Sequence, residues 1–137
     1  MGGAGGLKYL LDTHIWIWSL LDPAQLTRKV RRELANPENE LWLSPISIWE
    51  LFVLVEKGRL KLNMEVQAWL DEALEKAPMK EAPITHEVVR LSRSVRLPHQ
   101  DPADRFLAAT AMVLELTLIS ADSRMLHSRD FSVLSNK

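Results

Sequence analysis

The sequence predicts a three-layer α/β/α sandwich built around a small, mainly parallel sheet. Short apolar runs of strand length alternate along the chain with longer segments whose apolar residues have helical spacing. Strands that alternate with helices are typical of a parallel sheet covered by helices on both faces. With 137 residues and 47% hydrophobic content, the chain is long enough for one domain with a substantial core.

The first half of the chain is expected to form two strands and three helices. In order, these are a strand at 7–11, a short helix through 15–18, a helix at 26–35, a strand at 41–43 and a helix over 45–57. Pro23 and Pro37 end the first two helices, because the residue before a proline avoids the helical conformation. Ser44 is a suitable N-cap for the third helix, Pro45 suits its first turn, and Gly58 ends it.

The second half is expected to continue the same alternation. In order, it contains an amphipathic helix at 64–76, a connection or weak edge strand at 78–84, a helix from 85 through 91, a loop at 97–100, an Ala-rich helix started by 101–102 and running through 106–114, a strand at 117–120, a helical turn at 123–127 and a strand at 131–134. Val66, Trp69, Leu70 and Leu74 share one face of the first of these helices. The Ala-rich helix is expected to be central and buried.

Composition limits the classes of function. The chain has no cysteine, which excludes disulfides, thiolate metal sites and a cysteine nucleophile, and suits a reducing cytoplasm. The formal charge of −1 gives no global basic field, so any basic surface must be local. No apolar stretch approaches the roughly 20 residues of a membrane helix, and no association with a membrane is expected. Residues 1–6 are interpreted as a flexible leader or a cloning remnant, and residues 7–137 as a single domain.

Four acidic residues lie where an apolar run ends or a helix begins. They are Asp12, Glu50, Asp104 and Asp122. In an open parallel α/β sheet the carboxyl ends of the strands line the crevice where ligands bind, so these distant acids are expected to meet. Clustered carboxylates repel one another unless a hard cation neutralises them, and Mg²⁺ or Mn²⁺ prefers oxygen ligands. The pattern therefore predicts a metal-dependent phosphoryl-transfer site.

Four motifs together resemble a known family. They are, in order, Leu11-Asp12-Thr13-His14; Ser44-Pro45-Ile46-Ser47-Ile48-Trp49-Glu50 with Lys57-Gly58-Arg59-Leu60; Leu97-Pro98-His99-Gln100-Asp101-Pro102-Ala103-Asp104-Arg105; and Ser120-Ala121-Asp122. In this order and at these distances, the chain resembles PIN-domain ribonucleases, and within them the VapC-type toxins of bacterial and archaeal toxin–antitoxin pairs. The resemblance covers nearly the whole chain after the leader.

This resemblance implies a PIN-like fold in which the four acids form the metal-binding and catalytic set, with Thr13 and Ser120 as small hydroxyl residues beside it. Gln100 and Ala103 depart from the basic residue and phenylalanine that related members often carry. That departure concerns substrate preference and leaves the acidic set intact.

The resemblance also implies an activity and partners. The expected activity is an Mg²⁺- or Mn²⁺-dependent endoribonuclease that hydrolyses RNA to 5′-phosphate and 3′-hydroxyl products. The expected partners are an RNA substrate, a cognate antitoxin and a second copy of the chain in a homodimer. The alternative is a non-catalytic PIN-like or receiver-like module. A receiver normally needs an adjacent acidic pair and a late lysine, whereas Asp12 has no acidic neighbour and Ser120-Ala121-Asp122 contains no lysine.

Several neighbours of the acids have more than one interpretation. Asp101 before Pro102 is a suitable helix N-cap, and Asp104 either favours the helix dipole or binds metal. Arg105 either forms a salt bridge with an acid, contacts RNA phosphate or is solvated, and the first two are favoured. His99 either contacts substrate or is structural.

Two further expectations concern charge. The basic run Arg28, Lys29, Arg31 and Arg32 either is solvated or follows an RNA backbone. Carboxylates held together without metal repel, so at least one should have a raised pKa. Removing one charge, at Asp12 or Asp122, is then expected to stabilise the metal-free protein.

Overall fold

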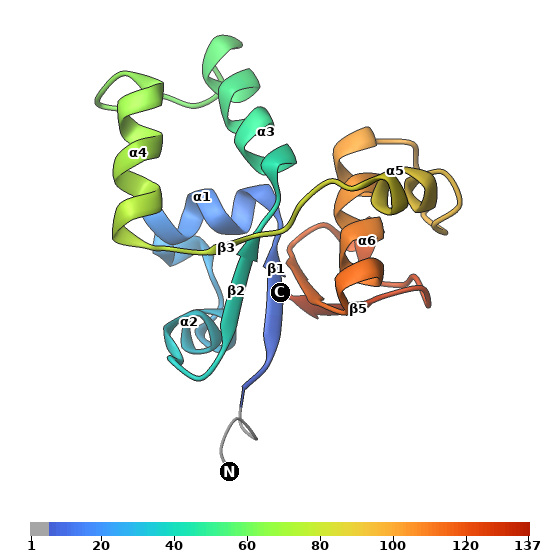
Figure 1. Ribbon diagram of the computed structural model, residues 1–137. Coiled ribbons are helices and arrows are strands. Elements are labelled where there is room, and N and C mark those ends of the chain that lie inside the picture. Colours follow the sequence, from blue (N-terminus) through green and yellow to red (C-terminus); the bar gives the residue numbers. More distant parts are fainter. Residues whose placement is uncertain (1–5) are drawn as a thin grey trace.

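Five strands form a single parallel sheet at the centre of the molecule (Figure 1). The computed structural model describes residues 6–137, so five of the six residues interpreted as a leader lie outside the described part. The strands are β1 (Lys8–Leu11), β2 (Glu40–Leu43), β3 (Lys80–Glu81), β4 (Thr117–Ser120) and β5 (Ser132–Ser135), in the order β3-β2-β1-β4-β5. Every strand pair in this sheet is parallel, and Leu10 of β1 lies opposite Trp42 and Leu118.

Helices cover both faces of the sheet. They are α1 (Thr13–Leu21), α2 (Arg28–Ala35), α3 (Pro45–Glu56), α4 (Val66–Lys76), α5 (His86–Ser92) and α6 (Pro102–Leu114), with 3-10 turns η2 (Pro23–Gln25) and η3 (Ser123–Met125). Tyr9 and Leu11 pack in one core with α1 to α4, whereas Leu10 packs in a second core with α6. Successive strand residues point to opposite faces, so one short strand contributes to both cores. The predicted three-layer sandwich is confirmed.

The predicted elements are present, with shifts at their ends. The first helix begins at Thr13, earlier than expected, because Asp12 caps it directly after β1. Segment 78–84 forms only a two-residue edge strand, which pairs with β2. Within the described residues, no helix is long and apolar enough to cross a membrane.

Arg105 differs from its expected role. Its side chain is buried, 6% exposed, and forms no ion pair with a carboxylate in the described part of the chain. The guanidinium donates to the backbone oxygens of Ser92 at 2.7 Å, Val95 at 2.8 Å and His99 at 3.0 Å, with a longer contact to Arg93 at 3.4 Å. The expected salt bridge was therefore wrong, and the burial of the guanidinium argues against the expected phosphate contact.

The physical reason lies at the end of α5. The last carbonyls of a helix lack helical partners and carry partial negative charge, which a cation stabilises. The guanidinium has five N–H donors in a planar fork and can bind several carbonyls at once. Arg105 thus ties the loop after α5 to α6.

Replacing Arg105 by methionine should lower the free energy of unfolding by about 2–4 kcal/mol, because several buried carbonyl oxygens lose a charged donor. Urea denaturation followed by circular dichroism measures this loss. The matched control is Arg93→Met, at an exposed arginine of the loop that Arg105 binds, which should change stability by no more than about 0.5 kcal/mol. Equal stability of both variants would contradict the structural role of Arg105.

Candidate metal centre

The four predicted acids line one cleft at the carboxyl ends of the strands. The cleft has a volume of about 350 Å³ and contains Asp12, Glu50, Asp104 and Asp122 together with His14, Trp18, Asp101, Ala121 and Arg124. The acids come from four separate segments: the end of β1, the second turn of α3, the first turn of α6 and the residues after β4. The parallel topology brings them together, as the sequence predicts, whereas their role as metal ligands remains a prediction.

Asp12 is the most buried of these acids. One carboxylate oxygen caps α1 by accepting from the Thr13 amide at 2.7 Å, and the other accepts from the Ser120 hydroxyl at 2.7 Å. Ser120 also accepts from the Asp122 amide at 3.0 Å, so a single hydroxyl connects two acidic positions. Burial raises the pKa of Asp12, although both hydrogen bonds favour the ionised form.

Glu50 is held by hydroxyl groups. Thr13 donates to its carboxylate, and the hydroxyls of Thr13 and Ser47 lie 2.8 Å apart. The N-cap of α3 is Ser44, which leaves Glu50 in the second turn, facing the cleft. Burial raises the pKa of Glu50, and repulsion from Asp12 and other acids raises it further. Thr13 thus lies beside the acids, where the sequence places a small hydroxyl.

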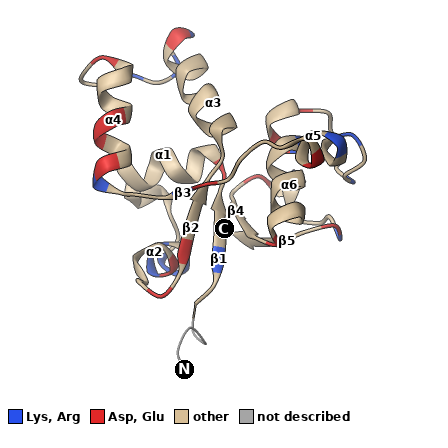
Figure 2. Ribbon diagram, in the orientation of Figure 1, with Lys and Arg blue, Asp and Glu red and all other residues tan. Residues whose placement is uncertain are grey.

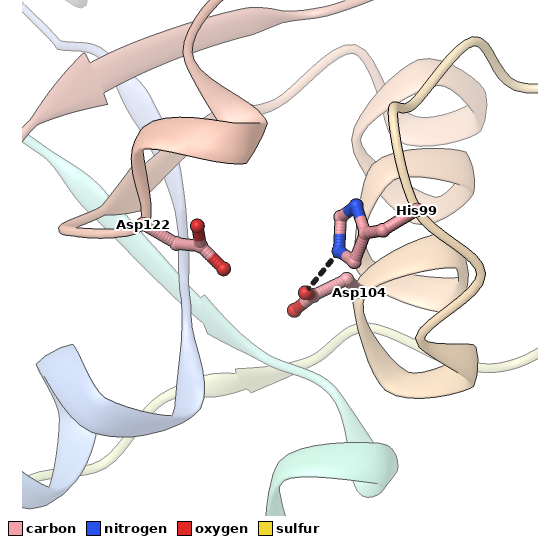
Figure 3. A group of neighbouring side chains, drawn as sticks. All are labelled: His99, Asp104 and Asp122. Carbon is pink, nitrogen blue, oxygen red and sulfur yellow. Dashed lines mark hydrogen bonds and ion pairs between the residues drawn. The ribbon is translucent and has the colours of Figure 1, made fainter.

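Asp101 and Asp104 differ in their surroundings. Asp101 is exposed and caps α6 by accepting from the Asp104 amide at 3.2 Å, as its position before Pro102 predicts. Asp104 is largely buried, and Nε2 of His99 lies 2.7 Å from its Oδ2 (Figure 3). Burial is the main cause that raises the pKa of Asp104 to about 6; repulsion from neighbouring acids adds to it and the His99 contact opposes it.

Asp122 behaves differently from the other three acids. Arg124, two residues later in η3, binds it through Nε at 3.1 Å and Nη2 at 2.8 Å, and Nη2 also lies 3.7 Å from Asp104. These bonds lower the pKa of Asp122. Arg124 was not predicted as a site residue, since a single arginine near an acid is common in protein sequences. The signal available was its position in the same short turn as a predicted metal ligand.

The donor atoms fit a hard divalent cation. One ligand atom each from His99, Asp104 and Asp122 can lie within 4.8 Å of the others, and Asp122 faces the His99–Asp104 pair (Figure 3). The cleft supplies carboxylate oxygens, an imidazole and no thiolate, a set that can hold a divalent cation and does not by itself select which one. Nδ1 of His99 is buried without a hydrogen-bond partner among the described residues. The chemistry of the donor set therefore agrees with the predicted class of ion.

Comparisons with known proteins agree with this architecture. A family model described as PIN domain matches residues 9–131. Ribonuclease VapC22 of Mycobacterium tuberculosis is 32% identical over 119 residues, which cover 85% of this chain and 88% of that protein. FitAcB from Neisseria gonorrhoeae has a TM-score of 0.62 at 25% identity, covering 93% of this chain and 97% of that chain. VapBC2 from Rickettsia felis, bound to a promoter DNA fragment, has a TM-score of 0.72 at 17% identity over 96% of this chain and all of that chain.

The opposite pKa shifts predict opposite effects of two similar substitutions in EDTA. The folded-state pKa of Asp104 is raised, so the stability present at low pH is lost as the pH rises through about 6. Asp104→Asn should therefore stabilise the metal-free protein at pH 7.5, by about 1–2 kcal/mol after allowance for solvent screening, and by less at pH 5.

Asp122→Asn should do the reverse. Its folded-state pKa is lowered, so its contribution is present near neutral pH and is lost as the pH falls through the folded value. The ion pair with Arg124 therefore predicts the opposite of the stabilisation expected from the sequence for removal of the Asp122 charge. Chemical denaturation at pH 5 and 7.5 measures both effects. Two variants that are both destabilised at pH 7.5 would contradict the predicted difference.

Proposed function

The chain belongs to the PIN domain family, and we propose that it is a metal-dependent endoribonuclease that acts as the toxin of a toxin–antitoxin pair. The observation that carries this proposal is the convergence of four carboxylates in one cleft. The similarity to a ribonuclease supports the substrate class, RNA. The proposed substrate implies action in the cytoplasm.

In this proposal Asp12, Glu50, Asp104 and Asp122 hold one or two Mg²⁺ or Mn²⁺ ions, directly or through water. A bound ion of this kind supplies a Lewis acid for the phosphate and lowers the pKa of water. Ser120 keeps the carboxylate of Asp12 in a single orientation, and Thr13 does the same for Glu50. His99 contributes by holding Oδ2 of Asp104 at 2.7 Å. Because a carboxylate must be deprotonated to bind a metal ion, affinity for the ion should fall as the pH is lowered.

The products follow from the nucleophile. Water that attacks the phosphorus in line displaces the 3′ oxygen, which leaves a 5′-phosphate and a 3′-hydroxyl. The ribose 2′-hydroxyl takes no part in bond making, so no 2′,3′-cyclic phosphate is formed.

An inhibitory protein partner is the second part of the proposal. A groove of about 480 Å³ between α1 and α4 is lined by the apolar side chains of Leu20, Leu21, Leu62, Met64 and Trp69, alternating with the polar side chains of Lys61, Asn63, Glu72 and Lys76. Such a groove suits the apolar face of an amphipathic helix. Solved complexes of similar fold include a toxin–antitoxin complex from Klebsiella pneumoniae. We propose that a cognate antitoxin binds in this groove and that the toxin is a homodimer.

The central test is RNA cleavage. Purified protein should cut RNA in Mg²⁺ or Mn²⁺ and stop in EDTA, and Asp12→Asn should lower the rate at least ~10²-fold, the scale for a main electrostatic contributor. Asp71→Asn, at an exposed aspartate of α4, is the matched control and should retain the rate. Expression of the chain alone should slow bacterial growth, and Asp12→Asn should not.

Two outcomes would contradict the proposal. Full cleavage in EDTA, or a 2′,3′-cyclic phosphate at the cut end, would exclude the metal-dependent hydrolysis. Growth arrest by both wild type and Asp12→Asn would instead favour the non-catalytic alternative, a PIN-like binding module.

Asp101 and Asp104 allow a sharper test within one turn of helix. Asp104→Asn should abolish cleavage while the protein remains folded. Asp101→Ala should lower stability by about 1 kcal/mol, the usual cost of a lost N-cap, and keep substantial activity. Thermal melts and initial rates on the same preparations separate the two effects. If both variants are folded and equally inactive, Asp101 belongs to the catalytic set.

A further inference from the structure

A second hollow lies beside the acidic cleft and shares one wall residue with it. We call it the basic groove and define it by Arg96, Leu97, Pro98, Arg124, His127 and Arg129, which with two serines enclose about 620 Å³. Arg124 lines both the basic groove and the acidic cleft. The groove lies between two segments, the loop from α5 to α6 and the stretch from η3 toward β5. Arg124 therefore stands at the boundary between the two hollows.

The charge of the basic groove is opposite to that of the cleft. No residue that lines it is acidic. Residues 88–100 contain three arginines and no Asp or Glu, although the whole chain has a formal charge of −1, and basic residues gather near α5 and the loop after it (Figure 2). Arg96 pairs with Asp130 at 3.2 Å, and Arg124 pairs with Asp122. Arg129 and His127 form no ion pair in the part of the chain that the structure describes, so Arg129 contributes an uncompensated charge.

Nucleic acid must approach the acidic cleft against its charge, because phosphates repel carboxylates. Guanidinium groups bind phosphate oxygens through two parallel N–H donors, so the contact is directional as well as electrostatically attractive. Leu97 and Pro98 add an apolar wall against which a ribose or base can pack. A groove with cationic edges has the electrostatic feature of a single-strand binding surface, a positive track for the phosphate backbone.

We propose that the basic groove binds the single-stranded RNA that continues from the cleavage site, with Arg96 and Arg129 contacting its phosphates and Arg124 at the junction. This inference rests on the proposed ribonuclease function and adds a path for the substrate. The basic run on α2, considered in the sequence, is at the other end of the sheet. The turn that follows α2 contacts the start of β1, where Asn39 accepts from the Leu7 amide at 3.0 Å.

The test compares RNA affinity at two basic surfaces. Wild type, Arg129→Ala, the double variant Arg96→Ala/Arg129→Ala and the control Arg31→Ala/Arg32→Ala bind a labelled single-stranded RNA in EDTA over a series of salt concentrations. For single strands, the logarithm of the binding constant falls with the logarithm of the salt concentration, with a slope of about 0.7 per phosphate contact. The loss of one contact then corresponds to about a fourfold loss of affinity at ~150 mM salt. Arg129→Ala should lose about that much and the double variant more than ~10-fold, with salt slopes reduced by about 0.7 and 1.4. The α2 control should match wild type in affinity and slope.

Cleavage kinetics in Mn²⁺ provide the second readout. The groove variants should raise KM more than they lower kcat, since they touch the strand beyond the reacting phosphate. Wild-type affinity and slope in the groove variants would overturn the inference, as would absence of salt-dependent RNA binding by wild type or a loss confined to the α2 control. The inference would also be overturned if the groove variants lost binding to an acidic protein partner and kept wild-type affinity for RNA, because the groove would then bind a protein. If wild type binds RNA through the groove but does not cleave it, the proposed nuclease activity is contradicted, whereas RNA binding by the basic groove is supported.

Discussion

The buried carboxylate of Asp12 is the interaction on which the arrangement of the site depends. A charge removed from water is costly unless hydrogen bonds compensate it. Asp12 meets this requirement with the amide of Thr13 and the hydroxyl of Ser120, while its own amide donates to the Ile119 carbonyl at 3.0 Å. These bonds join β1, β4 and α1 at a single residue. The groups that make the buried charge tolerable therefore also fix the geometry of the cleft.

The four acids do not form a uniform cluster. Burial and mutual repulsion raise the pKa of Asp12, Glu50 and Asp104, whereas Arg124 lowers that of Asp122. The side of the cleft near Asp122 is thus partly neutralised by the protein itself, and the side near Glu50 is not. A cation that enters the cleft is bound most strongly where no basic side chain competes for the carboxylates. The side near Glu50 should therefore attract it more than the side near Asp122.

Much of the fold and the acidic set was predictable because both follow from local rules. Strand length, helical spacing and caps such as Ser44 set the elements, and a parallel sheet brings the residues after β1 and β4 to the same edge. Asp101 was correctly interpreted as a cap because its partner is three residues away. The family match also excludes the receiver-like alternative.

The contacts that could not be predicted belong to side chains whose partners depend on the path of a loop. Arg105 follows an acidic residue in sequence, yet it turns away from the acids to the carbonyls after α5. Arg124 and His99 reach the acids only because η3 and the loop before α6 bend toward the cleft. No periodicity encodes such paths, since they result from packing between segments far apart in the chain.

The attachment of the 93–99 loop through Arg105 has a consequence for how this protein can change over time. Arg105 donates hydrogen bonds to backbone oxygens, and every residue type has the same backbone oxygen whatever its side chain. The exposed side chains of Arg93 and Arg96 are therefore free to vary without loss of these bonds or displacement of the helix that carries Asp104. Arg105 holds both the helix that carries Asp104 and the loop near the basic groove, but it does so through backbone atoms, and the loop side chains are separate from these bonds. New RNA preferences can be acquired by exchanging exposed side chains while the hydrolytic machinery is inherited intact.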